Sequence, residues 1–146
     1  MMIFTTELPI RFAHCDPAGI VFYPRYFEMM NGVVEDWCAQ GLGCSFHEMH
    51  MLRGIGLPTV HLETDFLKPA QLGEILQAEL TVLKLGNTSV EIQLCFSGQQ
   101  QDARLKARLV LVMMDLTLRQ AIAIPDELRA AMLHYCAAKD EKLASA

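Results

Sequence analysis

Positive charge is scarce in this 146-residue sequence, and it is not gathered in any one segment. Lysine and arginine number 12 against 17 aspartates and glutamates, which gives a formal net charge of −5. Proteins that bind nucleic acids or anionic membranes concentrate basic residues on one face or in one run. We therefore expect neither a nucleic acid nor a membrane among the partners of this protein.

The sequence also lacks long apolar runs and closely spaced cysteine pairs. No stretch of about 20 apolar residues is present to span a bilayer, and the first residues lack the basic start and apolar core of a signal peptide. The five cysteines are odd in number and include no Cys-x-x-Cys pair. This spacing argues against a disulfide framework or a zinc knuckle and suits a reducing compartment. We expect a cytoplasmic protein without a metal site.

Apolar residues, by contrast, are abundant. They make up 52% of the chain, whereas charged residues make up 20%. A chain of this length is typical of one domain and is long enough to bury a core without metals or disulfides. Obligate subunit interfaces are more apolar than ordinary protein surface. The surplus of apolar residues therefore predicts a single domain over residues 1–146 that assembles into a homo-oligomer.

The spacing of apolar residues predicts an α+β chain. Alternation indicates strands over residues 3–13, 57–67, 75–85, 89–96 and 104–118. A three-and-four spacing indicates a helix over residues 24–41, and helix-start signals indicate two more over residues 45–52 and 125–138. Residues 139–146 form a polar tail that we expect to be frayed. Short turns between consecutive strands imply an antiparallel sheet, and the mostly apolar first helix has to be covered by it.

Single residues add local detail to this prediction. Pro9 cannot donate a ladder hydrogen bond, so its strand is expected at a sheet edge or with a bulge. Gly86 and Asn87 tolerate positive φ and indicate a tight hairpin before residue 89. Ser45 and Glu48 have the spacing of a capping box and indicate the start of the second helix.

The densest group of chemically capable residues is the segment 14–24, which joins the first strand to the first helix. A helix N-terminus offers unpaired N–H groups and a positive dipole end, both of which suit a developing oxyanion. Asp16 lies a few residues before that end, so a carboxylate and an oxyanion site can share one cleft. Aspartate before proline also commonly forms an Asx turn, and the spacing alone leaves that structural role open.

Residues 11–26 (RFAHCDPAGIVFYPRY) closely resemble the signature of hotdog-fold acyl-CoA thioesterases of the 4-hydroxybenzoyl-CoA thioesterase family. The order of the expected elements is also similar to that of a hotdog fold. The resemblance covers nearly the whole chain, and Asp-Pro-Ala-Gly is its distinctive part. It implies a five-stranded antiparallel sheet wrapped around a long central helix, with a C-terminal helix. It also implies hydrolysis of an acyl-CoA thioester, such as 4-hydroxybenzoyl-CoA or a related aryl-CoA, to the free acid and CoA.

The resemblance further implies roles for individual residues. Asp16 matches the catalytic aspartate, acting as a nucleophile or as a general base, and the backbone N–H of Tyr23 matches the donor that polarises the thioester carbonyl. The residues that line the acyl pocket in the family correspond to Asn31 and Phe46. Those that would contact the CoA arm correspond to Pro58, Thr59, Asn87 and Thr88. The family's prototype has basic residues at this hairpin, where this chain has Gly86, Asn87 and Thr88, so Lys84 or another basic residue is expected to contact the CoA phosphates instead. No cofactor is implied, because CoA is part of the substrate.

The resemblance leaves the acyl group and the assembly open. The family's prototype carries an acidic residue where this chain has Asn31 and a tryptophan where it has Phe46. The alternatives are a thioesterase for short aliphatic acyl-CoA or for acyl carrier protein, and a non-catalytic acyl-CoA-binding protein that kept the fold. Catalytic clefts in the family lie between two subunits, so the resemblance implies a homodimer, commonly paired into a homotetramer.

Other residues have weaker claims to chemistry. His14 is close enough in sequence to orient the neighbouring aspartate. Glu28 and Glu35 lie on the central helix, where another hotdog branch places its catalytic carboxylate, although a solvated helix surface is the favoured interpretation. His47 and His50 are spaced as a possible metal pair but lack further ligands nearby, so no metal is expected there.

Overall fold

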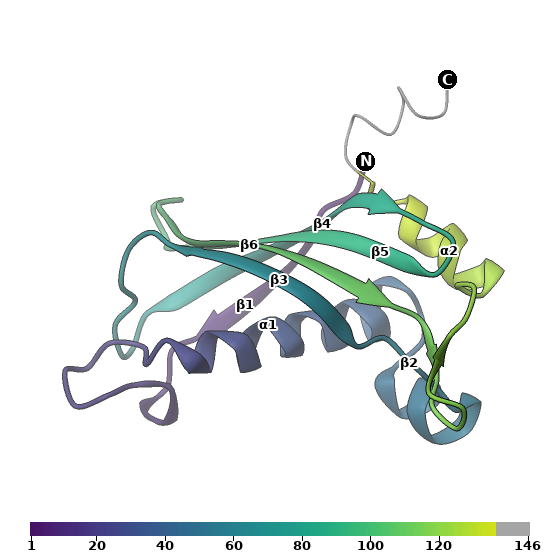
Figure 1. Cartoon of the computed structure of the whole chain (residues 1–146). Coiled ribbons are helices and arrows are strands. Elements are labelled where there is room, and N and C mark those ends of the chain that lie inside the picture. Colours follow the sequence, from purple (N-terminus) through teal and green to yellow (C-terminus); the bar gives the residue numbers. More distant parts are fainter. Residues whose placement is uncertain (137–146) are drawn as a thin grey trace.

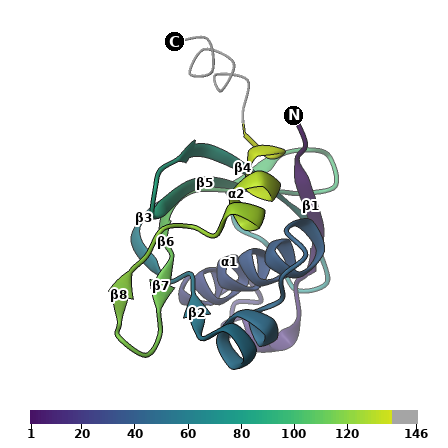
Figure 2. The same cartoon turned by 90° about the vertical axis from the view of Figure 1, so that its right-hand side faces the viewer.

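Five antiparallel strands form the main sheet of the structure, a computed structural model that describes residues 1–136. The order of the strands across the sheet is β1-β4-β5-β6-β3. Their bounds are β1 (Phe4–Pro9), β3 (Thr59–Phe66), β4 (Ile75–Leu85), β5 (Ser89–Ser97) and β6 (Ala103–Val112). The sheet curves over one side of helix α1 (Pro24–Asp36), as Figures 1 and 2 show.

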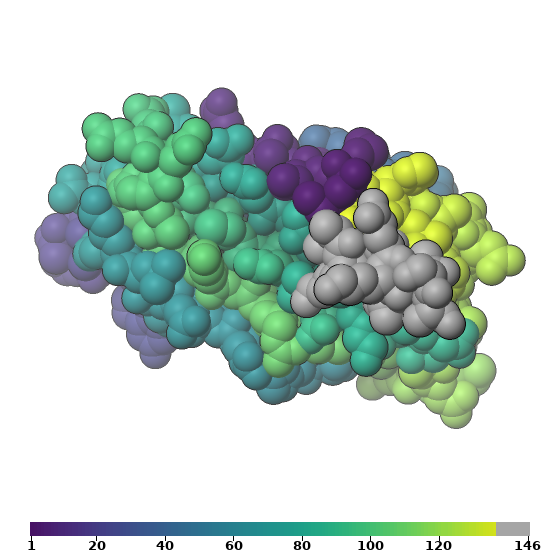
Figure 3. All heavy atoms as spheres, turned by 90° about the horizontal axis from the view of Figure 1, so that it is seen from above, coloured from purple at the N-terminus to yellow at the C-terminus, as the bar shows by residue number. Residues whose placement is uncertain are grey.

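Shorter elements extend the chain at both ends of this helix. A 3₁₀ turn, η1 (Phe12–His14), precedes α1, and two π-type turns follow it, η2 (Trp37–Gly41) and η3 (His47–Arg53). A small second sheet contains β2 (Ile55–Gly56), β7 (Met114–Asp115) and β8 (Gln120–Ala121). Helix α2 (Asp126–Leu133) lies beside the N-terminal segment (Figure 3), where the Met2 N–H donates to the His134 carbonyl over 2.8 Å.

The core lies between the sheet and α1. Alternate residues of β5 are fully buried, namely Val90, Ile92, Leu94 and Phe96. Met30 and Val33 of α1 belong to the same apolar cluster. No helix within residues 1–136 is long and apolar enough to cross a membrane.

The central helix is shorter and less covered than expected. α1 has 13 residues, and the five-residue π-type turn η2 continues it to Gly41, so the expected bounds 24–41 are met while a long central α-helix is not present. The sheet covers one side of α1, and Arg25, Glu28, Asn31 and Glu35 form an exposed stripe on the opposite side. Their spacing of three and four residues places them on one helix face, and these polar side chains favour solvent over a second apolar layer. The expectation of a wrapped helix is therefore wrong for one chain, whereas the antiparallel sheet over a helix is confirmed.

Several predicted element bounds need correction. The strand expected over 104–118 ends at Val112, because Met114 and Asp115 pair with β2 and β8 instead. Asp115 then accepts hydrogen bonds from the N–H groups of Thr117 and Leu118 at 2.9 and 2.8 Å, which turns the chain. The helix expected over 125–138 is α2 alone. Residues 137–138 and the expected tail 139–146 lie outside the described residues.

The residues expected to end strands, cap helices or form turns behave partly as predicted. Pro9 does lie on an edge strand, since β1 pairs only with β4. Ser45 Oγ accepts the Glu48 N–H over 3.1 Å, as one half of a capping box requires. Gly86 starts the β4–β5 hairpin without a positive φ. A Cβ atom at Gly86 would lie 2.9 Å from the Ser89 side chain. Glycine is therefore favoured there because a larger residue would clash with Ser89, and not because the backbone has a positive φ.

Candidate active site

The segment that carries Asp16 folds back on itself before α1 begins. The Phe22 N–H donates to the His14 carbonyl over 2.9 Å, and the Asp16 N–H donates to the Ile20 carbonyl over 3.0 Å. Gly19 reverses the chain at φ +79°, and its N–H donates to the Asp16 carbonyl over 3.0 Å. This hairpin-like loop brings Asp16 alongside the residues that lead into the helix, as the sequence predicted.

The Asp16 carboxylate is held by one of its two oxygens. Oδ1 accepts the Ala18 N–H over 2.8 Å, which is the Asx turn that the sequence left open. Within residues 1–136, no donor reaches Oδ2, and the side chain is only half-buried. The turn therefore orients the carboxylate while one oxygen stays available to a substrate or a water molecule.

The start of α1 supplies one unused backbone donor beside this loop. Pro24 at the first helical position has no N–H. The Arg25 N–H donates to the Phe22 carbonyl over 2.9 Å, and the Tyr26 N–H donates to the Tyr23 carbonyl over 3.1 Å. Among the described residues, nothing accepts the Tyr23 N–H. Of the backbone N–H groups expected at the start of the helix to bind an oxyanion, the N–H of Tyr23 is therefore the candidate.

An aromatic cavity of about 260 Å³ lies beside Tyr23. Its walls include Ile20, Val21, Tyr26 and Phe66. The Phe66 ring centroid lies 6.1 Å from that of Tyr23 in an edge-on arrangement and 5.8 Å from that of Tyr26. Burial raises the pKa of Tyr26 above its ordinary value. The cavity therefore presents apolar rings, with a neutral phenol at neutral pH, next to the unused Tyr23 donor.

The two residues expected to line an acyl pocket lie elsewhere within this chain. Asn31 is exposed on α1, eight residues and so about 12 Å of helix rise beyond Tyr23. The Phe46 ring packs edge-on against His50 with centroids 5.0 Å apart. Neither residue lines the aromatic cavity. A single chain therefore does not bring these two residues to Asp16.

The residues expected to contact CoA gather at one end of the sheet. The Pro58 carbonyl accepts the Val112 N–H over 3.0 Å, and the Thr88 carbonyl accepts the Met113 N–H over 2.8 Å. The remaining members, Thr59, Lys84 and Asn87, are exposed. Figure 1 shows that the end of the sheet with β2 and the β4–β5 hairpin lies away from the start of α1. One chain thus carries the catalytic and CoA-binding candidates at opposite ends.

The weaker candidates take structural roles. His14 Nδ1 accepts the Arg11 N–H over 2.9 Å, so its ring belongs to the turn η1. Glu28 is exposed and pairs with Arg25 over 2.7 Å, and Glu35 is exposed on the same helix. Within the part of the chain that the structure describes, no three His, Cys, Asp or Glu side chains gather in a way that could hold a metal ion.

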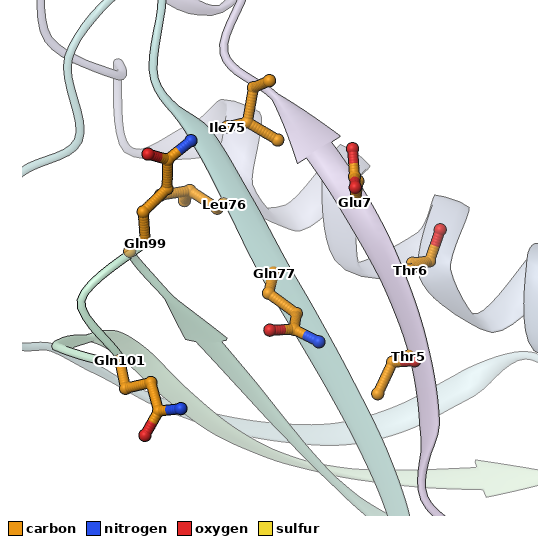
Figure 4. Close-up of a pocket in the computed structure, with 9 residues that line it drawn as sticks. Thr5, Thr6, Glu7, Ile75, Leu76, Gln77, Gln99 and Gln101 are labelled. Carbon is orange, nitrogen blue, oxygen red and sulfur yellow. The ribbon is translucent and has the colours of Figure 1, made fainter.

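A second hollow lies at the opposite edge of the sheet (Figure 4). It has a volume of about 430 Å³ and is lined by Thr5, Thr6 and Glu7 of β1, Ile75, Leu76 and Gln77 of β4, and Gln99 and Gln101 beyond β5. The lining side chains include no nucleophile paired with a base and none of the predicted site residues. This hollow is therefore a polar surface groove away from the chemistry.

Sequence reasoning missed the segment that supports the Asp16 loop. Ala70 is fully buried, and its carbonyl accepts the Val21 N–H over 2.9 Å. The Leu72 N–H donates to the Gly19 carbonyl, also over 2.9 Å. Beside this segment lies Arg104, whose charge is buried although it shares the alternation of the exposed Lys106 on β6. The pairing of β5 with β6 shifts its register at this point, which the alternation in the sequence does not predict.

Comparison with known proteins identifies relatives along most of the chain. The family model described as the thioesterase-like superfamily matches residues 10–132. A 1,4-dihydroxy-2-naphthoyl-CoA hydrolase of Synechocystis sp. is 30% identical over 82 residues, which cover 56% of this chain and 59% of that protein. The enzyme of the same name from Synechococcus elongatus is 27% identical over 121 residues, which cover 82% of this chain and 88% of that protein.

Solved structures share the same fold at low sequence identity. A 1,4-dihydroxy-2-naphthoyl-CoA thioesterase from Synechocystis superposes with a TM-score of 0.82 at 23% identity, covering 90% of this chain and 96% of that one. A Staphylococcus aureus protein solved in complex with CoA superposes with a TM-score of 0.83 at 17% identity, covering 92% of this chain and 84% of that one. These likenesses show that the sheet-over-helix arrangement is the hotdog-like fold of thioesterases.

Proposed function

The chain belongs to the thioesterase-like superfamily, and from this premise we propose that it hydrolyses an aromatic acyl-CoA thioester to the free acid and CoA. The prediction of an acyl-CoA thioesterase is confirmed at the level of enzyme class by the curated relatives. One observation carries the proposal for the site. Among residues 1–136, no donor reaches one carboxylate oxygen of Asp16 and no acceptor reaches the Tyr23 N–H, and both groups belong to one short loop.

The proposed chemistry follows from these two groups. In one route, Asp16 Oδ2 attacks the thioester carbonyl carbon, the thiolate of CoA leaves, and water opens the resulting mixed anhydride. In the other, Asp16 accepts a proton from the water that attacks the carbonyl. Both routes place negative charge on the carbonyl oxygen, where the Tyr23 N–H would donate. Loss of one such donor typically costs about 10²–10³ in rate.

The aromatic cavity supports an aryl acyl group. Its volume of about 260 Å³ is below the roughly 300–1,000 Å³ of pockets that bury a drug-sized ligand. It therefore suits an acyl group, with CoA lying outside it. Tyr26 and Phe66 offer ring faces and edges, which favour an aromatic partner. Aryl-CoA substrates such as 4-hydroxybenzoyl-CoA and 1,4-dihydroxy-2-naphthoyl-CoA are the compounds to test first.

A second copy of the chain would complete the site. β3 pairs only with β6, so its other edge is free within the described residues. Thr59 begins β3 at the end with the CoA candidates, and Phe66 ends it beside Tyr23. Antiparallel pairing of β3 with the β3 of a second copy would set the partner's CoA candidates against Asp16 and Tyr23. We therefore propose a homodimer as the functional unit and the pairing of two such dimers into a homotetramer.

The test is thiol release from a panel of aryl-CoA, aliphatic acyl-CoA and acyl carrier protein thioesters. Asp16→Asn keeps an oxygen for the Ala18 N–H, so the loop should stay folded while turnover falls by at least about 100-fold. Glu28→Gln is the matched control, since Glu28 is an exposed carboxylate on the nearby helix, and it should keep full activity.

Each other outcome contradicts a specific part of the proposal. Ordinary turnover by Asp16→Asn would remove the catalytic role of Asp16. Faster release from aliphatic or carrier-protein thioesters would replace the aryl substrate with one of those classes. Binding of acyl-CoA without turnover of any thioester would identify a non-catalytic binding protein.

A further inference from the structure

Arg104 is a buried charge on β6 that borders the aromatic cavity and has no role in the chemical steps proposed above. Its side chain is 8% exposed. A guanidinium taken out of water costs several kcal/mol unless well-aligned acceptors replace the lost hydration. Such a residue therefore depends on its partners, and their places in the chain indicate what it does.

Four acceptor oxygens surround this guanidinium. Glu74 binds it in a two-pronged manner, with Nη2–Oε2 and Nη1–Oε1 distances of 2.7 and 3.0 Å. Nε donates to Asp102 Oδ2 over 2.8 Å, and Nη1 also donates to the Pro69 carbonyl over 2.9 Å. These hydrogen bonds lower the pKa of Glu74 and lower that of Asp102 to about 2. Both carboxylates are thus charged at neutral pH and hold the guanidinium in place.

Two of the three partner residues, Pro69 and Glu74, lie at the two ends of one connection, residues 69–74, between β3 and β4, whereas Asp102 directly precedes β6. Arg104 reaches the first residue of this segment through the Pro69 carbonyl and the last through the Glu74 carboxylate. Glu74 Oε1 also accepts the Gln71 N–H over 2.7 Å, which fixes the turn in between. The Arg104 carbonyl accepts the Leu67 N–H over 2.9 Å just before the segment. Arg104 therefore holds both ends of residues 69–74 in place.

The same connection holds the catalytic loop. The carbonyl of Ala70 accepts the Val21 N–H, and the Leu72 N–H donates to the Gly19 carbonyl, each over 2.9 Å. Both hydrogen bonds hold residues that lie between Asp16 and Tyr23 in the loop. Any shift of residues 69–74 is consequently passed to the carboxylate and to the unused backbone donor.

We infer that Arg104 is a positioning residue for thioester hydrolysis: by clamping residues 69–74 it keeps Asp16 and the Tyr23 N–H in reacting geometry. This inference rests on the proposed function. It differs from a merely stabilising ion pair, because the clamp affects the rate of the chemical step in protein that is fully folded. A displacement of about 1 Å transmitted from outside a site can cost roughly 10²-fold in rate.

Arg104→Lys is the variant that tests the clamp. It keeps one positive charge for Glu74 and Asp102, but a single ammonium group cannot reproduce the planar fork that reaches all four oxygens. We expect kcat to fall by about 10–100-fold while KM changes by less than about twofold. The kcat loss should be the same for aryl and aliphatic acyl-CoA substrates, because the clamp acts on the loop.

Arg108→Lys is the matched control on the same strand. Arg108 donates to Glu63 over 2.8 Å and also contacts Glu91, and it has no link to residues 69–74. The control should therefore keep its kcat. Circular dichroism and thermal melting of both variants establish the folded fraction, so that the measured kcat refers to folded enzyme.

The outcomes separate the alternatives. An unchanged kcat in folded Arg104→Lys, or an equal fall in both variants, would overturn the clamp. Arg104 borders the acyl cavity, so a rise in KM confined to aryl substrates, with kcat unchanged, would also overturn the clamp and assign Arg104 to substrate binding. If Arg104→Lys does not fold, Glu74→Gln decides, since it keeps an acceptor oxygen and should still lower kcat. Failure of the proposed function appears separately, as normal turnover by Asp16→Asn.

Discussion

Replacing Gly19 with alanine tests the geometry of the Asp16 loop directly. Gly19 has φ +79°, and a Cβ atom built there meets nothing within 4 Å. Steric contact therefore adds nothing, and the cost is backbone strain alone. For a non-glycine residue in this left-handed region that strain is about 1–2 kcal/mol. We expect Gly19→Ala to lower the free energy of unfolding by this amount in urea titration.

The effect on activity follows from the hydrogen bonds of Gly19. Its N–H bonds to the Asp16 carbonyl and its carbonyl to the Leu72 N–H, so a loop that relieves the strain by rotating loses both contacts. A penalty of 1–2 kcal/mol corresponds to a factor of about 5–30 in population. The kcat of Gly19→Ala should therefore fall by up to that factor in a thiol-release assay.

A second glycine offers a control with the same strain. Gly43 has φ +73° and equally open space around its missing Cβ, but it follows the turn at the far end of the central helix. Gly43→Ala should lose the same stability and keep its kcat. Gly19→Asn should recover most activity, because asparagine adopts positive φ more readily. Equal kcat values for the two alanine variants would refute the reasoning, as would a stability loss in Gly19→Ala well above 2 kcal/mol.

Two further predictions concern assembly and pH. Leu67 donates its N–H to β6, so the alternation of the ladder turns the Thr64 N–H to the free edge of β3. Proline at position 64 removes that N–H, so Thr64→Pro should fold, run as a monomer in light scattering and lose activity. A dimer of this variant would rule out pairing through β3. Hydrogen bonds from Arg104 and Lys68 lower the pKa of Asp102 to about 2, so its stabilising contribution is complete above an ordinary carboxyl pKa of about 4 and disappears as the pH falls towards 2. The melting temperature of Asp102→Asn should therefore lie below that of the wild type at pH 5 and approach it at pH 2, whereas a constant gap would contradict the assignment.

Local patterns predicted the elements best where neighbouring residues decide the structure. The strand expected over 75–85 is β4 without any shift, because its alternation ends in turn residues on both sides. The strand expected over 104–118 was too long, because pairing with β2 and β8 ends β6 at Val112. The pairing of β7 with β2 joins segments about 60 residues apart, a contact that the periodicity of the sequence does not record.

The sequence by itself determined the local conformation of the Asp16 loop and the position of the Tyr23 N–H at the start of the helix. The Asx turn, the reversal at Gly19 and the missing N–H of Pro24 all depend on residues within a few positions of one another. Hydrogen bonds of this range follow from residue type, and so they can be read from a short motif.

Only the tertiary structure decided what surrounds that loop. Arg104 binds Pro69 and Glu74 from 35 and 30 residues away, and the free edge of β3 depends on the order of all five strands. The exposed stripe on α1 likewise depends on how far the sheet curves around the helix. Such contacts arise from chain topology, since segments distant in sequence meet only when the sheet has formed.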